Sequence, residues 1–278
     1  MRFGGPVLEK WQGPEQWARM VRQCGYTAAY CPAQASDSDE LVAAYAAEAD
    51  KAGFVIAEVG AWSNPISPDA RARREALAKC KAQLALAERI GARCCVNIAG
   101  SRGHSWHGHA AANFSDETFD AIVACVREII DAVAPTRTYY TLETMQWVPP
   151  DSTDSYERLL KAIDRDRFAV HFDPVNLINC PRRYHDTAAV IREFVARLGP
   201  HVRSCHAKDV SLAENAIVHL DEVRPGLGNL DYRTFLSEVD TLDGDTPVML
   251  EHLPTAEEYA EAAAHIRAVA EEVGVALG

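Results

Sequence analysis

Four ionisable residues stand at the ends of apolar segments in the second half of the chain. The strings TLE, HFD, SCH and MLE end in Glu143, Asp173, His206 and Glu251. Such residues are unexpected in runs apolar enough to form buried strands, because a buried charge needs a partner. Three carboxylates held together would repel one another unless a cation or shared protons intervened. The four residues therefore predict a divalent metal site in which all four are ligands.

The donor atoms of this set indicate both the metal and its chemistry. Three carboxylates and one imidazole favour Mn²⁺, with Mg²⁺, Co²⁺ and Zn²⁺ as alternatives. A metal bound to a substrate carbonyl and its neighbouring hydroxyl acidifies the adjacent C–H and stabilises an enediolate. Return of the proton to the opposite face gives an epimer, and its transfer to the next carbon gives an isomer. A leaving group on that carbon would instead depart by β-elimination. The residues leave these three outcomes open.

The elements that must position these residues alternate along the whole chain. Short β-branched or aromatic runs are followed by amphipathic stretches in about eight units of roughly 35 residues each. Strands are expected near 2–3 and over 26–32, 54–62, 93–100, 138–145, 168–176, 202–209 and 247–253. Helices are expected over 14–24, 38–51, 69–90, 115–133 and 185–198, and from Ser152, Tyr232 and Thr255.

This alternation predicts an α/β fold, a (β/α)₈ TIM barrel, as a single domain over residues 1–278. An open doubly wound sheet is the alternative architecture. It usually has G-x-G-x-x-G after an early strand, whereas the nearest match, GLGNLD at Gly226, follows a loop and lacks the third glycine. Active sites of TIM barrels lie at the C-terminal ends of the strands. The four strand-end residues should therefore converge on one volume.

The strings LET, HFDPVN, SCHAKD, RPGLGNLDYRTFL and MLEHL, in this order, resemble the xylose-isomerase-like family of sugar phosphate isomerases and epimerases. The resemblance spans the chain and is most specific in the second half. It implies a TIM barrel with one divalent metal on Glu143, Asp173, His206 and Glu251. It also implies that Glu143 and Glu251 are the catalytic acid/base pair on opposite faces of a keto sugar, and that the protein is a homo-oligomer, a dimer or a tetramer.

Four further residues are candidate substrate ligands in the second half of the chain. His171 and Lys208 each lie two residues from a predicted metal ligand, so strand alternation turns them to the same face. Arg224 lies at a position where the family often has a basic residue that binds substrate, although it could instead form an ion pair with Asp209 or Glu222. Asn176 stands where some family epimerases have histidine. An amide cannot shuttle a proton at neutral pH, which argues against ketohexose 3-epimerase activity.

The first half adds candidates that would line the pocket. Glu58 and Asn97 end the third and fourth expected strands, and Trp62 would form an apolar wall. The loop GSRGHSWHGH contains His104, His107 and His109. Three close histidines are compatible with a second metal, but a loop rich in Gly and Ser favours a flexible lid that carries Trp106 over the sugar.

The composition and net charge of the chain indicate which kinds of partner it can bind. The chain has 278 residues, 48% of them hydrophobic, and a formal charge of −12 from 40 acidic and 28 basic residues. Such a surface repels nucleic acid and anionic lipid. Eight cysteines without a C-x-x-C pair indicate reduced thiols, and the first residues lack the apolar segment of a signal peptide. We therefore expect a cytoplasmic enzyme with a small sugar substrate, no nucleic acid and no membrane partner.

Two other function classes deserve comparison with a sugar isomerase or lyase. A zinc nuclease similar to endonuclease IV would need further metal ligands and a basic face, and the negative charge argues against it. A non-catalytic sugar-binding subunit would not need the complete set of four metal ligands. The lyase alternative would act on a 3-keto sugar, a 3-keto glycoside or an inosose by dehydration.

Overall fold

Parallel strands close into an eight-stranded barrel in the computed structural model, which describes all of residues 1–278. The order around the barrel is β1-β10-β7-β6-β5-β4-β3-β2, so the first strand pairs with both the second and the last. The barrel strands are β1 (Arg2–Gly5), β2 (Ala28–Tyr30), β3 (Val55–Gly60), β4 (Cys94–Asn97), β5 (Tyr139–Glu143), β6 (Phe168–Phe172), β7 (Val202–Ala207) and β10 (Pro247–Leu250). The predicted TIM barrel is confirmed.

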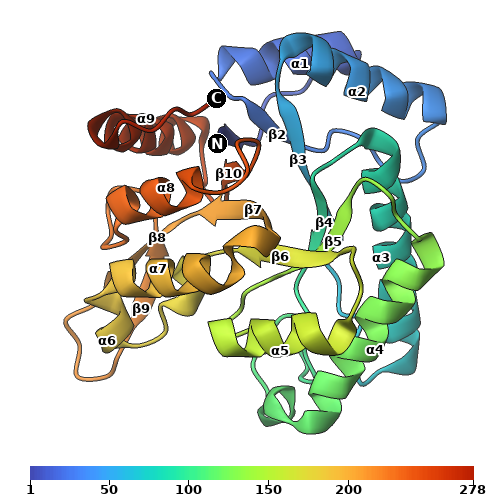
Figure 1. The fold of residues 1–278 in the computed structure, drawn as a ribbon, viewed down its shortest axis with the longest axis vertical. Coiled ribbons are helices and arrows are strands. Elements are labelled where there is room, and N and C mark those ends of the chain that lie inside the picture. Colours follow the sequence, from blue (N-terminus) through green and yellow to red (C-terminus); the bar gives the residue numbers. More distant parts are fainter.

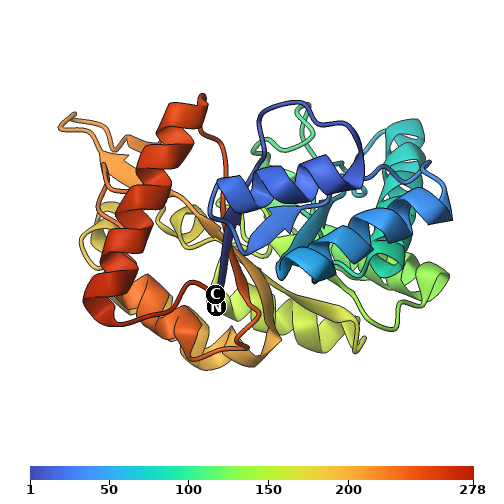
Figure 2. The same ribbon diagram turned by 90° about the horizontal axis from the view of Figure 1, so that it is seen from above.

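Helices surround the strands and cover the outside of the barrel (Figures 1 and 2). They are α1 (Gly13–Gln23), α2 (Asp39–Ala52), α3 (Ala70–Ile90), α4 (Asp116–Val133), α5 (Thr153–Ile163), α6 (Pro181–Tyr184), α7 (Thr187–Leu198), α8 (Tyr232–Asp240) and α9 (Ala256–Val273). Three 3₁₀ turns are η1 (Ala111–Phe114), η2 (Val175–Leu177) and η3 (Gly199–His201). None of the helices combines the length and the apolar character that a membrane crossing requires.

Local capping explains where the helices begin and end. The Ser115 hydroxyl accepts a hydrogen bond from the Thr118 N–H, so α4 begins directly after this serine, as predicted. Gly53 ends α2 in the left-handed conformation, with φ of 74°, where an L side chain would be strained. The helix expected over 185–198 differs, because the Asp186 side chain caps α7 and separates it from the short α6.

The main core lies between the barrel and the helices, and a smaller apolar cluster lies inside the barrel. Outward-facing strand residues join a cluster of 61 buried residues that packs against the helices. Ala28, Ala57 and Met249 from three strands form a separate cluster inside the barrel. Apolar side chains thus fill part of the barrel interior, as is usual for this fold. The polar residues of the site also face inward, at the C-terminal ends of the strands.

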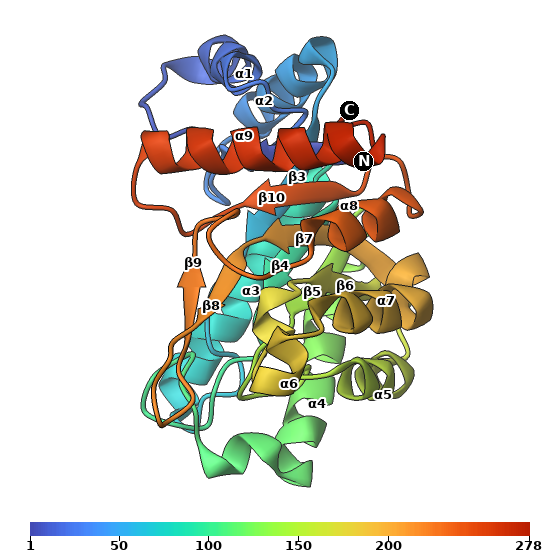
Figure 3. The ribbon, with the colours of Figure 1, turned by 90° about the vertical axis from the view of Figure 1, so that its left-hand side faces the viewer.

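A hairpin replaces the loop expected before the helix at Tyr232. It consists of the antiparallel strands β8 (Asp209–Leu212) and β9 (Leu220–Val223), and Figure 3 shows it extending away from the barrel. The Asp209 carboxylate accepts hydrogen bonds from the backbone N–H groups of Gly226, Gly228 and Leu230. A Cβ at Gly228 would overlap this carboxylate. The RPGLGNL string is therefore a loop wrapped around a buried aspartate.

Candidate metal centre

The four predicted metal ligands meet at the C-terminal end of the barrel. Glu143 is the last residue of β5, Asp173 directly follows β6, His206 lies on β7 and Glu251 directly follows β10. His206 Nδ1 lies 2.9 Å from Glu251 Oε1, 3.2 Å from Glu143 Oε1 and 4.0 Å from Asp173 Oδ2. One potential ligand atom from each residue lies within 4.8 Å of the others. The fold thus brings together side chains from four strands.

A buried lysine lies among these carboxylates. Lys208 Nζ is 2.6 Å from Glu251 Oε1, 2.8 Å from Asp173 Oδ2 and 3.5 Å from Glu143 Oε1. Only 3% of its side chain is exposed. A buried ammonium offsets part of the repulsion among the carboxylates. Lys208 thus lies on the same face as His206, as the sequence predicted. The side chains that its ammonium group contacts are the predicted metal ligands.

Charge and burial shift the protonation of the site strongly. Burial alone would raise the pKa of Glu143, but Lys208 and His206 lower it well below its ordinary value. Burial opposed by His206 likewise leaves the pKa of Glu251 lowered. Burial raises the pKa of Asp173 to about 7 against the opposing charge of Lys208. Burial would lower the pKa of His206, but the facing carboxylates, led by Glu251, raise it well above its ordinary value.

The side chains present fit a divalent cation. A hard ion prefers several carboxylate oxygens and accepts an imidazole nitrogen, and this cluster offers both. Glu251 Oε1 is buried and faces Lys208 Nζ at 2.6 Å and His206 Nδ1 at 2.9 Å. The donor chemistry of the cluster thus fits a divalent cation.

Glu58 and His171 lie beneath the four ligands rather than at the surface of a pocket. Glu58 Oε1 is 2.9 Å from His171 Nε2, and Glu58 Oε2 is 3.3 Å from His206 Nε2. The Ser204 hydroxyl also donates to Glu58 Oε1. All of these side chains are at most 1% exposed. The sequence suggested that His171 orients a ligand or binds substrate and that Glu58 lines the pocket, but the structure leaves neither of them accessible to a substrate.

Asn176 orients predicted ligands in the structure. Its Nδ2 atom donates hydrogen bonds of 3.0 Å to Glu143 Oε1 and of 3.0 Å to Asp173 Oδ2. Its Oδ1 atom accepts a hydrogen bond from Gln146, a residue that the sequence analysis did not single out. The amide is thus engaged on both sides. A substrate contact by Asn176 would have to replace one of these bonds.

Two predicted substrate ligands are not brought to the site. Asn97 is fully buried, and its amide donates to Cys80 Sγ and Tyr140 Oη and accepts from the Ser63 N–H. Arg224 forms ion pairs with α9, at 2.7 Å from Glu258 and 2.8 Å from Glu261. Asn97 faces the helix layer because alternation on β4 turns it outward. Arg224 faces α9 because two carboxylates there attract its guanidinium group.

Of the remaining candidates, Trp62 lies beside the cluster and His107 lies in the exposed loop after β4. The Trp62 ring centroid is 6.5 Å from that of His206, and 36% of Trp62 is exposed, so this indole flanks the site opening. His107 packs edge-on against Trp106 in the loop after β4, and both are exposed. No potential metal-ligand group includes His104, His107 or His109. The lid function of this loop stays a prediction.

Sequence reasoning missed several residues around the cluster. Ser204 lies two residues before His206, and this spacing could have indicated a shared face. Glu222 on β9 faces His252, with 3.2 Å between Glu222 Oε1 and His252 Nδ1. His252 also lies 3.7 Å from Glu251 Oε2 and has a φ of 59°. Neither the left-handed backbone conformation of His252 nor its contact with Glu222 on the hairpin can be recognised from the sequence alone.

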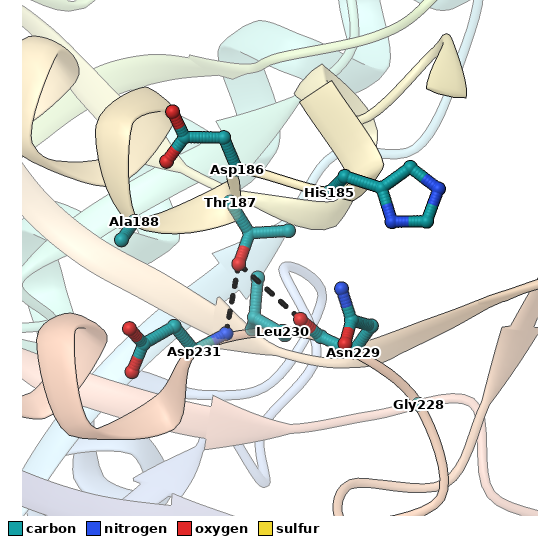
Figure 4. Close-up of a pocket in the computed structure, with 8 residues that line it drawn as sticks. All are labelled: His185, Asp186, Thr187, Ala188, Gly228, Asn229, Leu230 and Asp231. Atoms are coloured by element: carbon teal, nitrogen blue, oxygen red, sulfur yellow. Dashed lines mark hydrogen bonds between the residues drawn. The ribbon is translucent and has the colours of Figure 1, made fainter. Parts of the chain in front are cut away.

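A separate hollow lies between the start of α7 and the loop before α8 (Figure 4). The Thr187 hydroxyl in this hollow donates to the Asn229 carbonyl and accepts from the Asp231 N–H. Asp186 and Asp231 cap α7 and α8 with their side chains. These polar groups already serve the local fold. The hollow contains none of the predicted ligands, so it is not the candidate site.

The chain matches the family model described as xylose isomerase-like TIM barrel over residues 18–269. This match covers most of the chain, so the protein belongs to the xylose isomerase-like TIM barrel family. The predicted family is confirmed. No significant match was found among curated proteins.

Solved structures share the fold at low sequence identity. Endonuclease IV from Thermus thermophilus has a TM-score of 0.74 at 16% identity, covering 98% of this chain and 100% of that chain. The probable 3-DHS dehydratase AsbF from Bacillus anthracis has a TM-score of 0.72 at 16% identity, with 97% and 98% covered. D-psicose 3-epimerase from Clostridium cellulolyticum has a TM-score of 0.69 at 15% identity, with 99% and 100% covered. Similarity at this level shows the fold alone.

Proposed function

We propose that the protein is a divalent-metal-dependent isomerase or epimerase that acts on a keto sugar or cyclitol by proton abstraction through an enediolate. The observation that supports it is the convergence of Glu143, Asp173, His206 and Glu251 within a buried cluster. We assign one Mn²⁺ to these residues, with Mg²⁺, Co²⁺ and Zn²⁺ as alternatives. When bound, such an ion would polarise a substrate carbonyl and acidify the adjacent C–H.

Glu143 and Glu251 are the proposed proton carriers. Their carboxylates approach the His206 ring from different strands, which suits two bases placed around one substrate carbon. Both pKa values are lowered, so both groups are ionised at neutral pH and either can accept a proton from carbon. An isomerase can return that proton from the same carboxylate. An epimerase needs the second carboxylate to gain a proton before it protonates the opposite face.

Lys208 is the proposed electrostatic partner of the reacting oxygens. Its buried ammonium already lies beside three carboxylates and would attract the negative oxygen of an enediolate. Trp62 at the rim offers an apolar face for the carbon side of a sugar ring. The free cysteines of the chain suit a reducing compartment such as the cytoplasm.

A metal-dependent lyase is the second candidate, because His252 lies at the site opening. Its ring is 59% exposed, and its two nitrogens face Glu222 and Glu251. An imidazole in this position could protonate a departing hydroxyl, which β-elimination from a 3-keto sugar, a 3-keto glycoside or an inosose requires. The fold shared with the probable dehydratase AsbF is compatible with this alternative.

The nuclease alternative is weaker, although the fold resembles endonuclease IV. The second potential ligand group, Glu58, His171 and His206, is fully buried and its members hydrogen-bond one another. The formal charge of −12 also disfavours a phosphate polymer as substrate. We therefore propose a small sugar as substrate and no nucleic-acid partner.

Incubation of Mn²⁺-loaded protein with candidate keto sugars in D₂O tests the proposal. Deuterium should enter at one carbon next to the carbonyl, because a carboxylate base exchanges its proton with solvent. NMR and mass spectrometry of the sugar then identify the carbon and distinguish an epimer, an isomer and a dehydrated product. Absence of both exchange and product across keto sugars and inososes, in protein shown to contain the metal, would contradict the proposal.

A further inference from the structure

Glu58 occupies a special place on its strand. In the pairing of β2 with β3, Ala29 is opposite Ile56, and the next residue, Tyr30, is opposite Glu58. Ala57 on β3 therefore has no partner on β2. Ala57 belongs to the apolar cluster inside the barrel, and Glu58 contacts His171 and His206, so two successive side chains face inward. A β-bulge changes the direction of a side chain in this way. The bulge thus places a carboxylate below the candidate metal centre.

We propose that Glu58 is a positioning residue that determines which nitrogen of His206 faces the metal. This inference rests on the metal site of the proposed function. Glu58 Oε2 lies 3.3 Å from His206 Nε2, while Nδ1 of the same ring faces Glu143, Asp173 and Glu251. The two nitrogens of the ring therefore point to opposite sides. One meets the buried carboxylate, and the other meets the predicted metal ligands.

The hydrogen-bonding capacity of the two groups assigns the tautomer. An ionised carboxylate can only accept hydrogen bonds, and a neutral imidazole has one N–H group and one lone pair. Nε2 must therefore carry the hydrogen that Glu58 accepts, so the lone pair of the neutral, metal-binding ring lies on Nδ1. In the metal-free protein the facing carboxylates raise the pKa of His206, and Nδ1 then carries the proton that a metal must displace. A metal binds an imidazole through its lone pair, and a carboxylate behind the ring sets its tautomer and orientation. Glu58 thus prepares His206 to bind the metal through Nδ1.

Two further donors hold Glu58 in place. His171 Nε2 lies 2.9 Å from Glu58 Oε1, and the Ser204 hydroxyl donates to the same oxygen. His171 and Ser204 are register partners on β6 and β7, the strands that flank the site. With three donors around it, the carboxylate cannot rotate without losing bonds that no water replaces, because the group is 1% exposed.

The variant Glu58→Gln tests the inference, because it keeps the shape and converts one acceptor oxygen into an N–H₂ donor. An amide cannot accept from His206 on one side and from His171 and Ser204 on the other. We expect Mn²⁺ and Co²⁺ affinity to fall about 10- to 100-fold in competition with a fluorescent chelator. The absorption spectrum of the Co²⁺-loaded variant should also change. The melting temperature of the metal-free variant should change little, so that the loss of metal affinity cannot be attributed to unfolding.

Glu88→Gln is the matched control. Glu88 is also a carboxylate that holds several donors, namely the backbone N–H groups of Thr136, Arg137 and Thr138, but none of its partners belongs to the metal centre. This control should keep wild-type metal affinity. If Glu58→Gln does not fold, Glu58→Asp keeps the accepting charge at shorter reach and should show an intermediate loss of affinity.

The possible results separate the inference from the proposed function. Wild-type affinity and an unchanged Co²⁺ spectrum in Glu58→Gln would overturn the inference. So would a loss from two bound ions to one, because Glu58 would then be a ligand of a second metal. Metal binding by the wild type without any solvent exchange in a keto sugar would refute the proposed function and leave the positioning role intact. A wild-type protein that binds neither Mn²⁺ nor Co²⁺ would overturn both.

Discussion

The ammonium group of Lys208 lies 2.8 Å from the carboxylate of Asp173, and both side chains are buried at the C-terminal end of the barrel. Burial would lower the pKa of Lys208, but Asp173 and the neighbouring glutamates raise it well above its ordinary value. The lysine is therefore a permanent cation inside the site. It offsets part of the negative charge that a divalent metal would otherwise have to neutralise alone.

Replacement of this lysine should destabilise the metal-free protein. In Lys208→Met, several carboxylates lose a buried counter-charge, and loss of one partner of a buried ion pair costs about 3–5 kcal/mol. Urea unfolding should show this loss, and saturating Mn²⁺ should restore part of it. The control is Lys79→Met, because the Lys79 ammonium donates to the Trp62 carbonyl at the surface. A Lys208→Met protein as stable as the control would refute the role of the lysine as counter-charge.

Metal affinity should depend on pH through Asp173. Burial raises the pKa of Asp173 to about 7, so below this pH the metal-free carboxyl group is protonated. A metal must then displace this proton as well as that of His206, whose pKa the facing carboxylates raise. Asp173 should therefore add up to about tenfold per pH unit to the fall in affinity as pH decreases below 7. Above pH 7 the contribution of Asp173 should level off. Isothermal titration with Mn²⁺ between about pH 5.5 and 8 in several buffers measures both the affinity and the protons released. An affinity independent of pH would contradict this assignment.

Loss of either proposed proton carrier should abolish turnover without unfolding the protein. Glu251→Gln and Glu143→Gln keep the side-chain shape but remove the base, and general acid/base catalysis contributes typically about 10²- to 10⁴-fold. Steady-state kinetics should show a loss of at least this size, with unchanged circular dichroism. Glu261→Gln is the control, because Glu261 pairs with Arg224 on the outer surface. Kinetics of Glu251→Gln near those of the wild type would exclude its acid/base role.

Glu88 should make the stability of the protein depend on acid pH. Burial would raise the pKa of Glu88, but hydrogen bonds from Thr136, Arg137 and Thr138 lower it to about 2. A lowered native pKa stabilises the fold above the ordinary value of 4.5, and this stabilisation is lost as pH falls from 4.5 towards 2. Glu88→Gln should cost about 1–3 kcal/mol at pH 7, because several backbone donors lose their charged acceptor, and should flatten the acid limb of the stability curve.

Urea unfolding of both proteins between about pH 2.5 and 7 checks this prediction. Glu128→Gln is a suitable control, because Glu128 pairs with Lys81 at the surface. Such surface pairs contribute at most about 1 kcal/mol. Equal pH dependence in Glu88→Gln and the wild type would show that the Glu88 carboxylate does not anchor the start of β5.

The barrel could be predicted because its signals are local. Caps such as Ser115 and Asp69, and stop signals such as Gly53 and Gly91, define helix ends within a few residues of chain. The spacing of apolar runs then reveals the strands. The hairpin β8–β9 gave no such signal, because each strand has only four residues and only Asp209 and Val210 at the start of β8 are buried.

The roles of individual side chains were harder to predict. Glu58, Asn97 and Arg224 were all expected at a pocket, yet the first lies below the cluster, the second faces α3 and the third pairs with α9. Glu58 turns inward at a bulge, and a bulge depends on the pairing of two strands. The direction of Arg224 depends on carboxylates more than thirty residues away in the chain.

By itself the sequence determined the barrel and the set of four residues whose strand-end positions predicted convergence, because these features follow from periodicity and spacing along one chain. Its motifs also resembled the family that the family model confirms. Only the tertiary structure decided that Lys208 lies among the carboxylates, that Glu58 stands behind His206 and that Asn176 bonds two predicted ligands. Distances between side chains on different strands depend on register, bulges and competing partners. These are properties of the closed barrel and not of any local segment.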